Sequence, residues 1–172
     1  VKNYSKLVMK NHKYLFLAFT TIIVLSLFRL IPHPPNFTPI LAISVFAGIK
    51  FNNNLFSFLV PIIAMLISDA IIGFHSGILV VYSAIFLSAV IAKKFNSINS
   101  SVLASCIIFF LVTNFQVWIV SPGYSKSLSG ILECYTLAIP FFGMTFLSTF
   151  FYSYILFYGY ALLTKMKVYQ KI

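Results

Sequence analysis

Only two of the 172 residues, Asp69 and Glu133, carry a carboxylate side chain. Asp69 lies in a long apolar run, where insertion of a carboxylate into a bilayer costs about 2.5–3.5 kcal/mol. We expect such a group to bind a ligand or an ion, to pair with Arg29 or lie near Glu133, or to reach solvent at a helix end. His75 follows six residues later in a glycine-flanked turn. Asp69 and His75 are also residue types that serve as acid and base in catalysis.

The same residue types can bind a transition metal when they converge. His33, His75, Asp69 and Glu133 are the candidates, but no short spacing such as His-x-x-x-His places two of them on one helical turn. We therefore predict no metal and no cofactor, and we assign no catalytic residue.

Several polar and aromatic side chains suit the binding of a small molecule. The planar guanidinium of Arg29 fits a carboxylate or a phosphate, although it can also extend to lipid headgroups. Amide and aromatic groups around Trp118 can contact a planar ligand, or they can tie helices together and mark the membrane interface. The predicted substrate-binding residues are Arg29, His33, Asn36, Asp69, His75, Asn114, Trp118, Tyr124 and Glu133.

The composition defines the environment of these residues. Hydrophobic residues make up 60% of the chain and charged residues 8%, whereas soluble domains are about 25% charged. The net charge of +10 comes from basic residues scattered among apolar runs. Nucleic-acid-binding proteins instead cluster basic residues on a polar face. We therefore expect a polytopic membrane protein that binds no nucleic acid.

Hydrophobic segment lengths predict the fold. About 20 helical residues cross the roughly 30 Å hydrocarbon core of a bilayer. We expect an all-α membrane helix bundle of about six transmembrane helices, forming a single domain over residues 1–172. The predicted spans lie near residues 14–31, 39–51, 55–72, 77–92, 102–121 and 143–163, with a short surface or half-inserted helix near 128–142. The segment 39–51 is short and could be re-entrant.

Charge placement predicts the orientation of this bundle. With six spans, ten basic residues fall on the side of the two termini and two on the opposite side. The positive-inside rule then places both termini in the cytoplasm. The outward connections hold most of the proline, histidine and tryptophan. Polar groups that converge within an apolar wall are typical of a small-molecule pocket.

Small residues and cysteines give further expectations. Small residues at helical spacing allow helices to approach closely within the chain, or allow a partner subunit to dock. Cys106 and Cys134 are predicted at different depths, too far apart for a disulfide, and Cys134 is expected to be reachable from outside. The small residues are Ser44 and Gly48, then Ala64 and Ser68, and then Ala84, Ser88 and Ala92.

Four outward motifs extend over nearly the whole chain. They are Arg29–Pro39, which contains Pro-His-Pro-Pro-Asn-Phe-Thr-Pro, then Ser68–His75, Thr113–Trp118, and Glu133–Tyr135 with Ile139–Phe142. Together they resemble the signature of a family of small bacterial integral membrane proteins of unknown function. This resemblance implies the bacterial cytoplasmic (inner) membrane but no activity. The size, the six spans, the inward termini and the outward loops also resemble the S components of energy-coupling factor transporters, which bind vitamins.

Our leading hypothesis is substrate capture for uptake, with a small vitamin-like or other planar molecule bound from the extracytoplasmic side. The 172 residues contain no Walker loop, so uptake driven by ATP would need a membrane coupling subunit with an ATPase module. One alternative is a structural or assembly subunit of a membrane envelope complex. Another is a membrane-embedded enzyme on lipid-linked substrates. The expected partners are the small-molecule ligand, the lipid bilayer and, for driven uptake, the coupling subunit.

Overall fold

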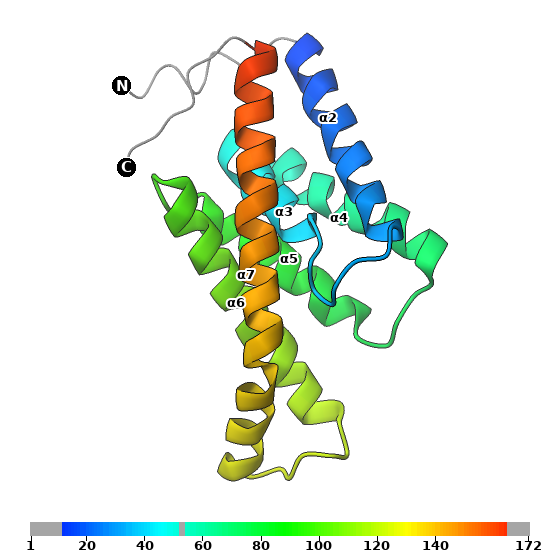
Figure 1. Cartoon of the computed structure of the whole chain (residues 1–172), viewed down its shortest axis with the longest axis vertical. Helices are drawn as coiled ribbons and strands as arrows, with labels where there is room; N and C mark the ends of the chain where they lie inside the picture. Colours follow the sequence, from blue (N-terminus) through cyan, green and yellow to red (C-terminus); the bar gives the residue numbers. More distant parts are fainter. Residues whose placement is uncertain (1–11, 52–53, 165–172) are drawn as a thin grey trace.

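The computed structural model describes residues 12–51 and 54–164, and these residues form helices joined by turns (Figure 1). The predicted all-α bundle is confirmed. The elements are α2 (His12–Leu27), the 3-10 turn η1 (Phe28–Leu30), α3 (Ile40–Lys50), α4 (Asn54–Ile72), α5 (Ile78–Ala92), α6 (Ile98–Val120) and α7 (Leu128–Thr164).

Some of the helices are long enough to cross the hydrocarbon core of a bilayer and others are shorter. Among the described residues, three stretches are long and apolar enough to cross a membrane: Leu55–Ile72, Ile98–Val120 and Leu128–Leu162. These stretches support a membrane protein. The helices α2, α3 and α5 have 16, 11 and 15 residues. At 1.5 Å per residue, α3 is about 17 Å long, so the predicted span 39–51 is too short to cross the hydrocarbon core alone.

The short helix α3 lies at the centre of the bundle. Every residue from Ile40 to Gly48 is buried, and α3 packs against α4, α5, α6 and α7. A helix that is apolar on all sides is stable when protein surrounds it, which accounts for its uniform sequence. Gly48 touches the backbone of α5, because a Cβ at this position would lie 2.4 Å from the carbonyl oxygen of Ala89.

Serine hydroxyls join α5 to α6. Ser88 donates to the carbonyl of Ser105 at 3.3 Å, and Ser105 donates to the carbonyl of Ser88 at 3.1 Å. Ser101 donates to the carbonyl of Ala92 at 3.1 Å. These bonds need closely spaced backbones, which small side chains permit. All seven small residues that the sequence singles out are buried inside this chain, so they serve its own packing.

The last helix is longer than the sequence predicts. α7 is one helix of 37 residues, about 55 Å long at 1.5 Å per residue. The predicted break into a short helix at 128–142 and a span at 143–163 is wrong. A proline inside a helix removes one backbone hydrogen bond, and apolar membrane helices tolerate this loss, so the helix continues through Pro140. Figure 1 shows the first part of α7 and the last part of α6 extending beyond the other helices as a hairpin.

The connections separate toward two ends of the bundle. The ammonium of Lys50, at the end of α3, lies 5.5 Å from the ring centroid of Phe157 on the last part of α7. Asn99, at the start of α6, accepts a hydrogen bond of 2.8 Å from the Tyr154 hydroxyl. The described ends of α2 and α7 lie at this same end, and the α6–α7 connection lies at the other (Figure 1). This grouping agrees with the alternation predicted from charge, and which end faces the cytoplasm stays a prediction.

Candidate functional site

Arg29 and Asp69 form the charged centre of the candidate site. The Arg29 Nη1 donates to Oδ1 of Asp69 and, at 2.7 Å, to the hydroxyl of Ser68. On the other side, the Tyr82 hydroxyl donates to Oδ2 of Asp69 at 2.9 Å. The Asp69 side chain is 1% exposed and the Arg29 side chain 16%. Both carboxylate oxygens are therefore hydrogen-bonded, as a buried charge requires.

Three elements position these groups. The chain tightens from α2 into η1, where the amide of Ile31 donates to the carbonyl of Phe28 at 3.2 Å, and Arg29 lies inside this turn. Asp69 lies in the last turn of α4, and Tyr82 lies in α5. Of the expected arrangements, the Arg29–Asp69 pair is the one observed, and Asp69 is not solvated.

A cavity of about 790 Å³ lies beside the pair. Its wall includes residues of α3, α4, α5, α6, α7 and the connection between η1 and α3. Four predicted binding residues line it, so the fold brings together side chains separated by 46 positions in the sequence. These four are Arg29, His33, Asn36 and His75.

Two histidines stand at the exposed edge of this cavity. His33 and His75 are both exposed. The Nδ1 of His33 lies 2.5 Å from the carbonyl oxygen of Ile31. A carbonyl only accepts, so Nδ1 carries the hydrogen and Nε2 is left as an acceptor in the neutral ring. The lining of the cavity therefore includes a hydrogen-bond acceptor from His33 and hydrogen-bond donors from the guanidinium of Arg29.

A second cavity of about 460 Å³ lies between α6 and α7, beside the first. Asn114 and Tyr124, two further predicted residues, line it. The Asn114 amide donates to the carbonyl of Phe110 on its own helix at 2.8 Å. This side-chain donor is thus used within α6, and among the described residues it makes no hydrogen bond to another helix.

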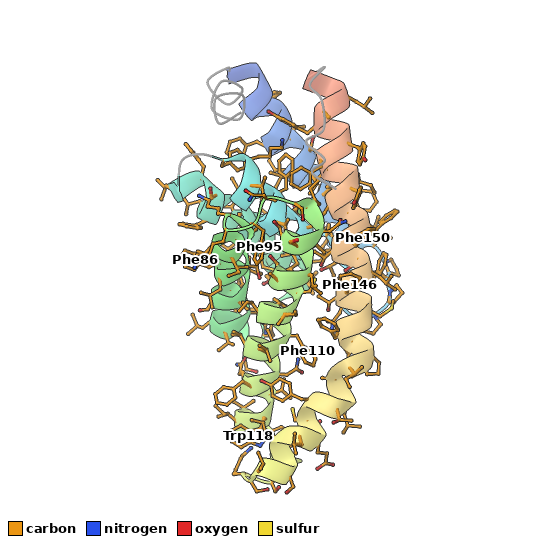
Figure 2. All side chains as sticks on the ribbon, turned by 90° about the vertical axis from the view of Figure 1, so that its left-hand side faces the viewer. Phe86, Phe95, Phe110, Trp118, Phe146 and Phe150 are labelled. Carbon is orange, nitrogen blue, oxygen red and sulfur yellow. The ribbon has the colours of Figure 1, made fainter. Side chains whose placement is uncertain are left out.

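Trp118 and Glu133 line neither of these two cavities. Figure 2 shows Phe110 between α6 and α7 and Trp118 nearer the closed end of the hairpin. The Trp118 indole donates to the carbonyl of Ser125 at 3.0 Å, and the Lys126 ammonium lies 5.7 Å from the centroid of its ring. Trp118 therefore holds the α6–α7 turn in place. Glu133 is exposed and makes no hydrogen bond or ion pair with the residues that the structure describes.

Several residues of the site were not predicted from the sequence. Tyr82 completes the bonding of Asp69, and hydroxyls of α7 line the larger cavity. A signal for the latter exists in the sequence, because three hydroxyl residues in an apolar run at spacings of three and four share one helix face. These residues are Thr145, Ser148 and Thr149.

The arrangement of the acidic and histidine side chains bears on metal ligation and on acid–base chemistry. Within residues 12–51 and 54–164, no three His, Cys, Asp or Glu side chains gather where they could hold a metal ion. The two oxygens of Asp69 are engaged by Arg29 and Tyr82, and no hydrogen bond joins Asp69 to His75. Asp69 is thus placed to orient Arg29 and is poorly placed to exchange a proton with a substrate.

The two cysteines are free and buried, which confirms that they form no disulfide. Cys134 is 2% exposed, and its sulfur lies 3.6 Å from the carbonyl oxygen of Asn114. The expectation that Cys134 is reachable from outside is wrong, because the residue faces α6 from inside the hairpin.

Comparison with known proteins identifies a family for this chain. No curated protein and no solved structure matches it. Residues 9–171 match a family that is described as "Family of unknown function (DUF6580)", in agreement with the expected membership of a family of unknown function. The chain therefore belongs to this family.

Proposed function

We propose that this protein captures a small vitamin-like or other planar molecule from the extracytoplasmic side and serves its uptake across the membrane. The observation that carries the proposal is the cavity of about 790 Å³ beside the Arg29 guanidinium. Pockets for small molecules typically measure about 300–1,000 Å³ and combine an apolar wall with a few fixed polar groups.

The polar groups of this cavity are held in place before any ligand binds. Asp69 and Ser68 fix Nη1 of Arg29, and the Ile31 carbonyl fixes the ring of His33. Fixed donors and acceptors reduce the conformational entropy that a ligand must overcome. Most of the remaining wall is apolar, with aliphatic side chains and Phe109 facing the cavity.

The uptake part of the proposal rests on architecture. A small helical bundle with a pocket beside its outward connections resembles the S components of energy-coupling factor transporters. A membrane coupling subunit with an ATPase module would drive the transport step. The small-residue faces are buried in this chain, so they offer a docking surface neither to a coupling subunit nor to an assembly partner, and a bound ligand is what distinguishes the two roles.

The test is identification of the bound compound. The protein is purified in mild detergent and denatured, and the extract is analysed by mass spectrometry. The variant Arg29→Gln/Asp69→Asn removes the guanidinium without leaving a lone buried carboxylate. Glu133→Gln is the matched control, because Glu133 is exposed and lines neither cavity.

We expect one compound in stoichiometric amount in the wild type and in Glu133→Gln, and its loss from the double variant. Retention of the compound in the double variant would place binding elsewhere. An empty wild-type extract, together with a co-purifying membrane protein, would favour the assembly role over capture.

A further inference from the structure

We propose that the two cavities form one bipartite site for an elongated amphipathic molecule, with an oxygen-rich head at Arg29 and a flat apolar body between α6 and α7. This inference rests on the proposed function and names the class of its ligand. The shared chemistry is a carboxylate or phosphate head joined to an apolar body, as in an organic acid or an anionic lipid.

The two cavities adjoin each other. Asn36, Val81, Phe109 and Thr145 line both of them. These four residues come from the proline-rich connection, α5, α6 and α7, so four segments of the chain contribute to the boundary. A ligand that extends past these side chains would occupy both volumes.

The first cavity suits the head. Nη1 of Arg29 is used by Asp69 and Ser68, whereas Nε and Nη2 have no acceptor among the described residues. Arg29 lines the cavity, and its remaining N–H groups form a planar fork that fits paired oxygens. Among the described residues the Ser153 hydroxyl alone is a buried side-chain polar atom without a partner, so these Arg29 donors are not sealed off and stay accessible to a ligand that supplies oxygens.

The second cavity suits an apolar, flat body. Phe109, Phe110 and Phe142 line it, and the rings of Phe110 and Phe142 meet edge to face at 5.1 Å. Two of its polar side chains are bonded to their own helix: Thr113 donates to the carbonyl of Phe109 and Asn114 to that of Phe110, each at 2.8 Å. The wall is therefore mostly apolar and includes several phenylalanine rings, which can stack with flat apolar groups.

The test uses dansyl-aminoundecanoate, a fluorescent acid whose carboxylate and aromatic ring lie at opposite ends of a chain. Binding is measured with the protein in phosphatidylcholine nanodiscs, and empty nanodiscs provide the baseline. Arg29→Gln/Asp69→Asn removes the head contact. Ala138→Leu and Ala138→Trp fill the second cavity in two steps, because Ala138 is buried and lines it. Ile139→Trp is the matched control, since the neighbouring Ile139 is 59% exposed and lines neither cavity.

We expect affinity to fall about tenfold or more in the Arg29 variant and in Ala138→Trp, less in Ala138→Leu, and not in Ile139→Trp. A loss confined to the Arg29 variant would overturn the bipartite site and leave the capture function standing. Binding to the wild type that equals the empty nanodiscs, or that no variant changes, would also overturn it. The compound extracted from the purified protein tests the capture function separately.

Competition distinguishes the two sources of such a ligand. Naphthoate added from water should displace the dansyl probe if the site takes a soluble organic acid. Phosphatidylglycerol included in the nanodisc should displace it if the site takes an anionic lipid. Displacement by either one supports the site, and displacement by neither contradicts it.

Discussion

The backbone carbonyl of Asn36 accepts a hydrogen bond of 3.2 Å from the hydroxyl of Ser148, which lies 112 residues further along the chain. This bond fixes the proline-rich connection against the middle of α7. It also places the Asn36 side chain where the two cavities meet. Among the described residues other than glycine, Asn36 alone has a positive φ, at 63°.

The conformation of Asn36 predicts different effects of two substitutions. Alanine is disfavoured in the left-handed region, so Asn36→Ala should lower the free energy of unfolding by about 1–2 kcal/mol. Asn36→Gly removes the same side chain but adopts this φ readily, and it should cost less. Unfolding by sodium dodecyl sulfate in mixed micelles measures both values. Equal losses in the two variants would show that the backbone here is not left-handed.

The Arg29–Asp69 pair predicts a strong coupling between two residues. Asp69→Ala leaves a mostly buried guanidinium without its partner, and breaking such a pair typically costs about 3–5 kcal/mol. The double variant Arg29→Met/Asp69→Leu replaces both charges with apolar groups and should recover much of this loss. A double-mutant cycle with the single variants Arg29→Met and Asp69→Leu, in the same unfolding assay, checks the coupling. Additive losses would mean that the two side chains do not interact.

Substitution of Gly48 by alanine should create a packing defect, whereas the same substitution of Gly143 should not. A Cβ at position 48 would lie 2.4 Å from the carbonyl oxygen of Ala89, so Gly48→Ala must push α3 and α5 apart. The expected loss of stability is about 1–3 kcal/mol. Gly143, inside α7, has open space around its Cβ position, and Gly143→Ala should be neutral or stabilising by up to about 1 kcal/mol. A tolerated Gly48→Ala would contradict the close approach of the two helices.

Membrane orientation is testable with introduced cysteines, because both natural ones are buried. In a background of Cys106→Ala and Cys134→Ala, we would introduce Pro122→Cys in the α6–α7 turn and Lys94→Cys after α5. Both positions are exposed. An impermeant maleimide applied to intact spheroplasts should label position 122, and position 94 only after permeabilisation. The opposite pattern would reverse the predicted orientation and place the cavity edge on the cytoplasmic side.

The sequence predicted the helix bundle, and most helix bounds agree with the structure to within a few residues. Apolar run length and the turn residues between runs are local properties, so they could be read directly for α4 and α5. The start of α6 is four residues earlier than expected, at Ile98, where the Ser97 hydroxyl accepts from the Ser100 amide at 3.1 Å. The continuity of α7 could not be predicted, because a proline either ends or merely interrupts the hydrogen bonding of a helix depending on what surrounds it.

The sequence by itself determined that this is a helical membrane protein and singled out unusual residues at helix ends and connections that are predicted to face outward. Only the tertiary structure decided how these residues are distributed. Four of them gather around one cavity, Asn114 and Tyr124 line a second, and Trp118 and Glu133 lie apart. The reason is that the deciding contacts join distant parts of the chain, 40 residues apart for Arg29 and Asp69 and 112 for Asn36 and Ser148. Composition and residue spacing do not indicate such pairings, because they form only when the helices pack around α3.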